Sequence, residues 1–532
     1  MSENAEAVPV ENPTKSSRLA VLLAMAMFVL VVDTSIMNVS ISAIVQDLGT
    51  TVSGIQSAIA LEALVSAAFI LINSKVGDLI GRKRAYTLGL IGYAVGAISM
   101  TLTQSLVPVV IFWAIIGGLG ASLLLPAMQS LIHGNFEGAA RKRAYALVGA
   151  ATGIAAAVGP LLGGFITTYL SWRVAFLLEF VIIVIVLLNI RLVRDVPYTG
   201  SRQIDIVGSI LSVVGMGGIV LGVLVWQEGG EFVGILIAVG AVAMAIFAWW
   251  LIRRKRQGKP MLIDPDLFKS IYFRLGISGQ MLQNISLGGM MIALPIYFQM
   301  VFEYSAMQTG LAMAPLSLSI FFVALLAGRR AGKRRPSRII QIGFAGLVIG
   351  ALLLILVIPR ADSALLFFIP LVITGSGLGL LVSQLNNFTL APISEERVSE
   401  AAGVNSAAGS FGLSFGLAFA GGMMLAALSF SFTNMAQSSL VLNPVQQDQV
   451  AGALEEDAQI MSNTLLLEQL EGQPAEVQAE IIRINDESRN LALQIAMLVP
   501  LIAGLLGLLS SFISVRLPDI EPSASAEELL MG

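Results

Sequence analysis

Long apolar runs separated by short polar turns dominate this chain. Fourteen runs of about 18 residues or more, each bounded by charged residues, fill most of the 532 positions. A run of this length crosses the hydrocarbon core of a bilayer as an α-helix, because a helix satisfies its backbone hydrogen bonds within one segment. The chain is therefore predicted to be an all-α polytopic membrane protein with 14 transmembrane helices. The runs begin near Leu19, Ser53, Tyr86, Val107, Ala144, Val174, Ile206, Phe232, Leu275, Met307, Ile339, Ala364, Ala401 and Leu491.

Composition excludes several other classes of protein. Hydrophobic residues make up 56% of the chain and charged residues only 12%, which is too little charge for a soluble protein of this size. The absence of cysteine excludes disulfides and thiolate metal sites, and the single His133 excludes a multi-histidine metal site. The net charge of −3 gives no reason to expect nucleic-acid binding. No Walker phosphate loop is present, so we expect no direct use of ATP. We also expect no enzyme activity, no cofactor and no metal.

The positions of Lys and Arg predict the orientation in the membrane. With the amino terminus inside, only Arg173, Arg360, Arg483 and Arg489 of the 31 Lys and Arg residues fall on the outer side. Basic loops stay in the cytoplasm, because this bias sets the topology of membrane proteins. We therefore expect a multi-pass protein of the cell inner (plasma) membrane, in contact with membrane lipids and with both termini in the cytoplasm.

A charged turn joins the second and third apolar runs. It reads Ser-Lys-Val-Gly-Asp-Leu-Ile-Gly-Arg-Lys-Arg over residues 74–84. An acid in this place can pair with a neighbouring helix end or an arginine, and so hold one conformation against another. The spacing Asp-x-x-Gly-Arg-Lys resembles the signature loop between helices 2 and 3 of the major facilitator superfamily. The residues of this predicted conformational latch are Asp78, Gly81, Arg82 and Arg84.

A second basic turn suggests two related halves, as the major facilitator fold has. Residues 328–333, after the tenth run, read Gly-Arg-Arg-Ala-Gly-Lys and lack the Asp. Two related six-helix halves place a substrate site between them near the midplane, and rocking exposes the site to each side in turn. We predict a cytoplasmic tail at 1–18, an N-terminal half at 19–194, an inserted helix pair at 195–260, a C-terminal half at 261–516 and a cytoplasmic tail at 517–532.

Residues 430–488 break the pattern of apolar runs. This outer segment holds ten acidic residues against Arg483 alone. Within it, two sets of apolar residues recur at helical spacing, the second after Pro474. We expect an extracytoplasmic helical hairpin whose second arm runs on into the last membrane span, and a surface for an envelope partner. The two sets are Val450, Leu454, Met461 and Leu465, and Val477, Ile481 and Ile484.

Two motifs narrow the resemblance to one family. The fifth run contains Gly159, Pro160, Gly163 and Gly164 in the order Gly-Pro-x-x-Gly-Gly. This resembles the motif that marks exporters working as antiporters. Residues 33–40 resemble the first-helix motif Asp-x-Thr-x-x-Asn-x-Ala of the fourteen-span drug:proton antiporter family. The resemblance covers roughly residues 19–430 and the last helix. It implies secondary active, proton-coupled antiport of hydrophobic or cationic drug-like compounds by alternating access.

Three acidic residues lie at membrane depth, namely Asp33, Glu62 and Glu179. A carboxylate at this depth costs several kcal/mol unless it is protonated, paired or hydrated, so each is a candidate for proton coupling. Relatives often have Tyr in place of Glu62 and Asn in place of Glu179, and Ala114 replaces an arginine implicated in coupling. At a rise of about 1.5 Å per residue, all three acids fall at mid to outer depth.

We predict that Asp33 and Glu62 share one aqueous cavity and together carry the coupling. Two acids in a low dielectric repel each other when both are ionised, so one would hold a proton near neutral pH. Glu179 is either a third member of this group or an interfacial residue. The alternative for Asp33 is that it hydrogen-bonds the backbone or groups beside Asn38 and only shapes the helix.

Neutral polar side chains, most of them in the C-terminal half, are candidates for the substrate cavity. They would hydrogen-bond a substrate across the cavity or, equally, tie neighbouring helices together. The predicted cavity residues are Asn38, Gln280, Gln283, Asn284, Gln384, Asn387 and Asn405.

Two other functions stay open. In the first, the protein exports a lipid or another amphiphile to the outer leaflet or envelope. The missing cation at Ala114 and the outer hairpin favour this function. A receptor or scaffold of another class would use the same fold without turnover. A lateral opening filled with lipid tails would favour the first, and carboxylates walled off by packed side chains the second.

Introduced cysteines test the predicted orientation, since the chain has no native thiol. Cysteines at Ser2, Lys142 and Arg334 should resist a membrane-impermeant maleimide in intact cells, because basic segments stay inside. A cysteine at Gln469 should react. All four should react in lysed cells, which serves as the control for reactivity. Labelling of Lys142→Cys from outside would overturn the topology.

Overall fold

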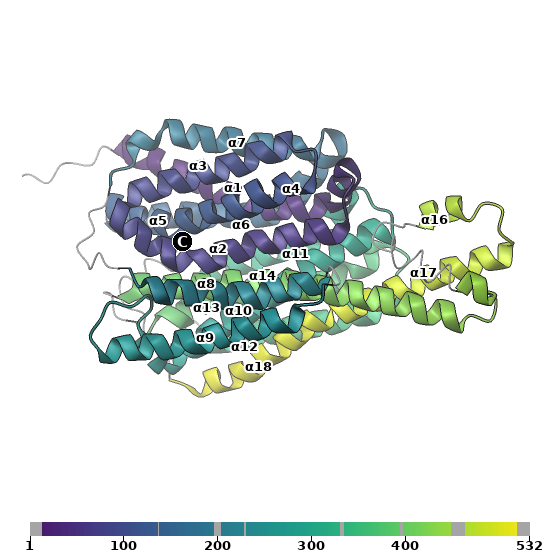
Figure 1. The fold of residues 1–532 in the computed structure, drawn as a ribbon. Helices are drawn as coiled ribbons and strands as arrows, with labels where there is room; N and C mark the ends of the chain where they lie inside the picture. The colour runs from purple at the N-terminus through teal and green to yellow at the C-terminus, as the bar shows by residue number, and fades with distance from the viewer. Residues whose placement is uncertain are drawn as a thin grey trace, which may run out of the picture.

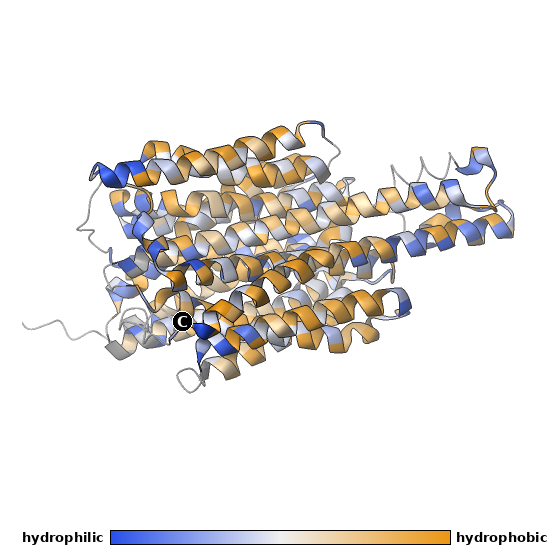
Figure 2. Ribbon diagram, turned by 90° about the horizontal axis from the view of Figure 1, so that it is seen from below, coloured by the Kyte–Doolittle hydropathy of each residue, from blue (hydrophilic) through white to orange (hydrophobic). Residues whose placement is uncertain are grey.

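The computed structural model shows a bundle of long helices that run side by side across one apolar layer (Figures 1 and 2). The structure describes residues 13–136, 138–195, 204–227, 230–329, 335–393, 397–447 and 463–518. Within these residues, thirteen helices are long and apolar enough to cross a membrane. A helix of 17 residues, Trp172–Leu188, occupies the remaining predicted span. The expectation of an all-α polytopic fold is confirmed.

The first six spans follow the predicted order, and two of them are capped by hydroxyl side chains. Thr51 accepts from the Gly54 amide at the start of α2, and Ser171 accepts from the Arg173 amide at the start of α7. These caps satisfy amides that have no partner within the helix. The helices are α1 (Pro13–Leu48), α2 (Val52–Ile80), α3 (Arg82–Leu102), α4 (Leu106–Pro108) running through a π-helical segment (Val109–Gly117) into α5 (Gly118–Asn135), α6 (Gly138–Tyr169) and α7 (Trp172–Leu188).

The remaining membrane helices differ from the predicted spans mainly in length. Helix α14 has 41 residues, about twice the number that crosses the hydrocarbon core of a bilayer, so it extends well beyond the apolar layer. The helices are α8 (Ile206–Gln227), α9 (Val233–Arg256), α10 (Ile271–Met300), α11 (Ala306–Arg329), α12 (Pro336–Val357), α13 (Phe368–Leu390), α14 (Val398–Ser438), α17 (Ala475–Ala496) and α18 (Leu498–Arg516), with the short α16 (Asn463–Gln469) before α17.

The helices pack as two groups that meet along two seams. In the first group, α1 packs on α6 and α7, and α3 packs on α5 and α7. In the second group, α10 packs on α14 and α18, and α12 packs on α13 and α18. The seams are α2 against α14 and α6 against α11, while α8 and α9 pair and α8 rests on α2 and α14. The domain boundaries stay a prediction, and most of the tails at 1–18 and 517–532 lies outside the described residues.

The loop after α9 ties the helix pair α8–α9 to the start of α14. Asp264 accepts from Lys255 at 2.6 Å and pairs with Arg397 at 3.1 Å, and its amide donates to Glu400 at 2.6 Å. Hydrogen bonds from Lys255 and Lys269 lower the pKa of the neighbouring Asp266 to about 2. The network therefore keeps both acids ionised at neutral pH and fixes this end of α9.

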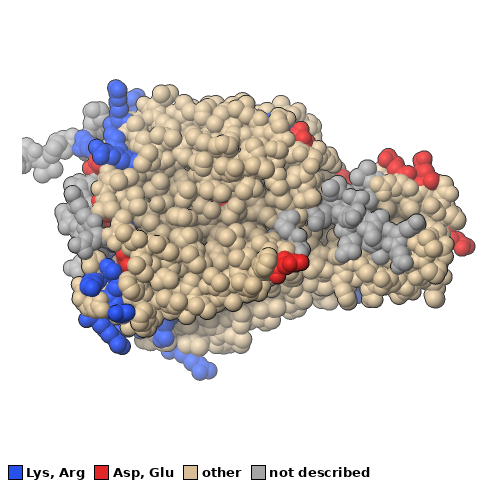
Figure 3. Space-filling view, viewed as in Figure 1, with Lys and Arg blue, Asp and Glu red and all other residues tan. Residues whose placement is uncertain are grey.

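Charge separates the two ends of the bundle. Most of the described Lys and Arg side chains gather at the end where α9 finishes, and acids mark the opposite tip (Figure 3). Between them the surface is apolar, as Leu188, Ile206, Leu356 and Ile369 show by their exposure. This is the distribution expected of a protein that spans a bilayer. The end with these Lys and Arg side chains is called the basic end below. The opposite end of the bundle is called the outer end.

Helices α14, α16 and α17 form a projection at the outer end (Figure 1). The first arm is the extension of α14 to Ser438, and the second arm, α17, continues into α18 as predicted. Val477, Ile481 and Ile484 are buried along α17, which confirms the second apolar set. Of the first set, Val450, Leu454 and Met461 lie outside the described residues, as does the side chain of Leu465.

The end of α10 holds this projection in place. The Tyr297 hydroxyl donates to Asn490 of α17 at 2.6 Å. Glu303 accepts from the amide and the hydroxyl of Thr464, at 2.8 and 2.5 Å. Glu303 is the non-glycine residue with positive φ in the described chain, at 53°. Such a conformation persists only where surrounding contacts fix it, so the junction is built tightly.

Tyr297→Phe and Glu303→Gln should loosen the projection without unfolding the bundle. Each change removes or weakens hydrogen bonds worth about 1 kcal/mol net, so amide exchange over residues 463–490 should become several-fold faster. Hydrogen exchange read by mass spectrometry measures this. Tyr169→Phe is the control, since Tyr169 is 66% exposed. Unchanged exchange in both variants would show that these contacts do not hold the projection.

Candidate functional site

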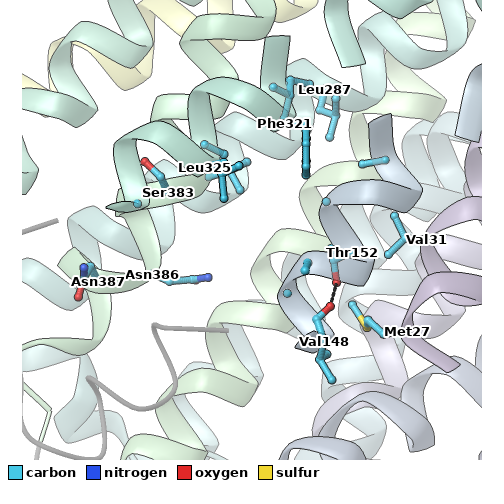
Figure 4. A pocket seen from close by; sticks show the side chains of 18 of the residues that line it. Met27, Val31, Val148, Thr152, Leu287, Phe321, Leu325, Ser383, Asn386 and Asn387 are labelled. Atoms are coloured by element: carbon cyan, nitrogen blue, oxygen red, sulfur yellow. Dashed lines mark hydrogen bonds between the residues drawn. The ribbon is translucent and has the colours of Figure 1, made fainter. Parts of the chain in front are cut away.

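A cavity of about 2200 Å³ lies between the two groups of helices. Met27, Val31, Val148 and Thr152 face Asn386, Asn387 and Leu325 across it (Figure 4). Arg143 and Arg338 line its mouth and are exposed, whereas Pro160 and Glu62 lie deep within the bundle. The cavity therefore opens at the basic end and ends near the middle of the apolar layer.

The wall of the cavity is largely apolar and adaptable. Met27, Met128, Met291 and Met313 all line it, and methionine fits irregular ligands because its side chain is flexible and polarizable. Glu62 is the one carboxyl-bearing residue among the described residues of the wall. A cationic apolar molecule would find both an apolar surface and a counter-charge here.

Asn387 is the predicted cavity residue that the structure places on this wall. It lies beside Asn386, whose side chain points into the space in Figure 4. Asn405 of α14 lies behind, and its amide donates to Asn386 Oδ1 at 2.6 Å. Asn405 thus orients a wall residue and does not itself line the cavity.

The structure does not place the other predicted cavity residues on the wall. Asn38 donates to the Thr34 carbonyl at 2.7 Å, and Asn284 to the Gln280 carbonyl at 2.9 Å, so both amides bond to their own helices. Polar side chains here join or brace helices, which was the second interpretation of this set. The residues away from the wall are Asn38, Gln280, Gln283, Asn284, Gln384 and Asn405.

Asp33 lies at the centre of a buried polar cluster behind the cavity. Its exposure is 1%, although the next residues of α1, Thr34 and Ser35, line the cavity. Tyr93 of α3 donates to Asp33 Oδ2 at 2.5 Å, and Trp113 Nε1 donates to its two oxygens at 3.2 and 3.1 Å. The Asp33 carboxyl group therefore bonds to side chains of other helices. The alternative, in which it bonds to the backbone or to groups beside Asn38, does not match these contacts.

Glu62 and Glu179 complete the cluster from two other helices. Each is close enough to Asp33 to interact with its charge, and the Tyr93 hydroxyl interacts with all three acids. Glu62 lines the cavity, whereas Glu179 is 3% exposed and does not line it. In the described part of the chain, no Lys, Arg or His pairs with any of the three. The cluster is called the carboxyl cluster below.

Tyr93 and Trp113 were missed by the sequence analysis. Trp113 adjoins Ala114, the position where relatives carry an arginine, and both side chains are buried. Neutral N–H and O–H donors thus stand near the position where relatives carry a cation. The available signal was a Trp beside Ala114 and a Tyr on the preceding span. Buried Trp and Tyr side chains each carry a polar group that needs a hydrogen-bond partner.

The glycines of the antiporter motif let α6 approach two helices closely. An added Cβ at Gly163 would lie 2.9 Å from Ile36 Cα of α1, and one at Gly159 would collide with Ser35. On the other face, a Cβ at Gly164 would lie 2.9 Å from Met307 Cα of α11. Side chains would separate these backbones, so the glycines allow the α6–α11 seam to close at the outer end.

Hydrogen bonds across the groups reinforce this outer closure. Gln299 of α10 accepts from the Ser42 amide at 3.1 Å and donates to the Val39 carbonyl at 2.9 Å, both on α1. The Met307 amide donates to Thr168 of α6 at 2.9 Å. The outer end is therefore joined by backbone contacts between the groups, while the basic end is open.

The predicted latch forms a local ion pair in this state. Asp78 pairs with Arg82 in the same turn, and Arg84 is exposed. Gly81 has φ of 99°, which favours glycine, and Asp195 occupies the space beside it and accepts from the Lys83 amide at 2.9 Å. Asp195, not recognised from the sequence, thus caps the start of α3. Control of conformation by Asp78 stays a prediction.

The arrangement of two helix groups around a central cavity matches a large transporter family. The profile of the Major Facilitator Superfamily matches residues 23–206 and 203–417. The chain belongs to the major facilitator superfamily. The resemblance drawn from the motifs is confirmed, and the protein is a multi-pass membrane transporter.

Individual relatives include proteins named for multidrug resistance and multidrug export. The chain is 28% identical to multidrug resistance protein Stp of Mycobacterium tuberculosis, over 82% of this chain and 81% of that protein. It is 28% identical to multidrug export protein EmrB of Escherichia coli, over 63% of this chain and 66% of that protein. A solved bacterial homologue of the human lysosomal transporter Spinster shares the fold, with a TM-score of 0.60, 13% identity and coverage of 95% and 99%.

Gly164→Leu should weaken the outer closure. The larger side chain has to displace the backbone of α11, so the two groups should separate at the outer end. Spin labels on cysteines at Leu170 and Asp362 report that separation, and a longer distance population should appear. Gly217→Leu on α8 is the matched control, because a Cβ there meets no atom within 4 Å. An unchanged distance distribution in Gly164→Leu would contradict this role.

Proposed function

We propose that this transporter exports hydrophobic and cationic drug-like compounds from the cytoplasm in exchange for protons. One observation carries the proposal: Glu62 lies on the wall of the large cavity, and the buried Asp33 is close enough to interact with its charge. A ligand cation and a proton would compete for the same acidic group. The names of Stp and EmrB as multidrug proteins support the substrate class.

Exchange follows from the competition at the carboxyl cluster. With the cavity open to the cytoplasm, a cationic substrate stabilises the carboxylate form of Glu62, and a proton leaves. With the cavity open to the outside, protonation removes the counter-charge and the substrate dissociates. Each ligand shifts the population of states by its different affinity for the two forms.

The expected location follows from the same charge distribution. The basic end would lie in the cytoplasm. Both termini would then lie on the cytoplasmic side of the plasma membrane, and the projection on the outer side. The cavity seen in the structure then faces the cytoplasm. The structure would thus represent the inward-open state, which is the state that accepts a substrate from the cytoplasm.

The volume of the cavity favours a second candidate substrate. Pockets for drug-sized ligands usually measure about 300–1,000 Å³, and this cavity of about 2200 Å³ is larger. A lipid or another amphiphile would fit an apolar wall of this size. The receptor or scaffold alternative has less support, since Glu62 reaches the open cavity.

Asp33→Asn and Glu62→Gln test the coupling, because they keep shape and lose titration. In liposomes of purified protein, an imposed pH gradient should drive export of a fluorescent lipophilic cation by the natural chain. At least one variant should fall to the rate of protein-free liposomes while keeping its helical content. A fluorescent phospholipid in the same assay tests the second candidate.

Asp362→Asn is the control for loss of a carboxylate, since Asp362 is exposed in the loop after α12. It should export like the natural chain. If both Asp33→Asn and Glu62→Gln export normally under the gradient, the acids are structural and the proposed mechanism is wrong.

A further inference from the structure

Glu179 has surroundings unlike those of the other two acids. It lies on the inner face of α7, in line with Ala175, Phe176, Ile183 and Val186, which are all buried. Neither of its carboxyl oxygens accepts a hydrogen bond from any described residue. A buried carboxylate without donors or a cation is costly, so the neutral acid is the form that this position favours.

Asp33 has the opposite surroundings. Tyr93 and Trp113 donate to its oxygens, and donors of this kind stabilise a carboxylate. The titratable neighbours of Glu179 are Asp33 on α1 and Tyr93 on α3. Helix α6, which also packs on α7, has no titratable residue between Tyr145 and Tyr169. Glu179 therefore faces one anionic group and no cation.

We propose that Glu179 and Asp33 form a hydrogen-bonded pair of carboxyl groups, in which Glu179 keeps its proton throughout the exchange cycle and donates it in a hydrogen bond to Asp33. Two facing carboxyl groups cannot both ionise in a dry interior, whereas one acid and one carboxylate form a strong hydrogen bond. The O–H of Glu179 then points at Asp33 and fills the hydrogen-bonding capacity that its own position leaves open. The inference rests on the proposed function in taking Asp33 as a group that exchanges protons.

The pair gives the exchange a defined path and stoichiometry. A second proton binds to Asp33, and it leaves through Glu62, which lies on the cavity wall. Glu179 has no contact with the cavity, so its own proton stays. One proton is then exchanged per cycle at this cluster, and Glu179 acts as a positioning residue that supplies a donor to Asp33.

Infrared spectroscopy of the purified chain in lipid tests the retained proton directly. A protonated buried carboxyl group has a C=O stretching band separate from those of carboxylates. At neutral pH this band should be weaker in Glu179→Gln than in the natural chain. It should shift in Asp33→Asn, because the acceptor changes from a carboxylate to an amide. Glu476→Gln, which alters an exposed acid on α17, should leave it unchanged.

An infrared band that is identical in Glu179→Gln and the natural chain would overturn the proposal. This measurement needs no transport, so it separates failure of the carboxyl pair from failure of the proposed function. If the band depends on Glu179 but neither Asp33→Asn nor Glu62→Gln impairs export, the pair exists and the proton-coupled function fails.

The pH dependence of substrate binding gives a second test with a definite sign. Glu179→Leu removes a neutral donor from Asp33, so Asp33 should hold its proton more tightly. The half-maximal pH for binding should rise by about one to two pH units, which corresponds to one hydrogen bond to a charged group. Glu179→Gln keeps a donor and should shift it less. If Glu179 were ionised, both variants would remove a negative charge and the half-maximal pH would fall.

Discussion

Burial of three acidic side chains without a cation is the constraint on which the N-terminal helices depend. Asp33 is satisfied by Tyr93 and Trp113, so α1, α3 and the π-helical segment before α5 have to meet at this point. Glu62 avoids the cost of burial by reaching the cavity. The cluster thus links the buried acids to the cavity that we propose a substrate enters.

Close contact between helix backbones decides where that space lies. Glycines on α6 bring it against α1 and α11, and Gln299 joins α10 to the backbone of α1 at the outer end. Toward the basic end, Ile70 and Leu71 of α2 still pack against Val404 and Ala407 of α14, while the cavity separates α6 from α11 and α13. Opening the other side therefore requires the α6–α11 seam and the Gln299 contacts to separate together, which suits a rocking motion of two rigid groups.

The end of α10 and the turn after it connect the outer closure with the projection. Gln299 contacts α1, whereas Tyr297 and Glu303 contact α17 and the residues before it. A displacement of this helix end would change both its contacts with α1 and its contacts with the projection. The projection is thus placed where it can stabilise the closed outer end, and not merely carried by α14 as an appendage.

The sequence by itself determined the helices, the family and the three acids. Apolar runs of membrane-spanning length, conspicuous motifs and charges at membrane depth are local properties, so residues such as Asp33 and Gly164 could be read directly. Only the tertiary structure decided which side chains meet. Gln280 and Asn284 look like cavity residues in the sequence, yet α10 turns them toward Gly409 of α14. Tyr93 and Trp113 look like core aromatics, yet they bond Asp33, because the facing of each helix is set by packing between distant segments.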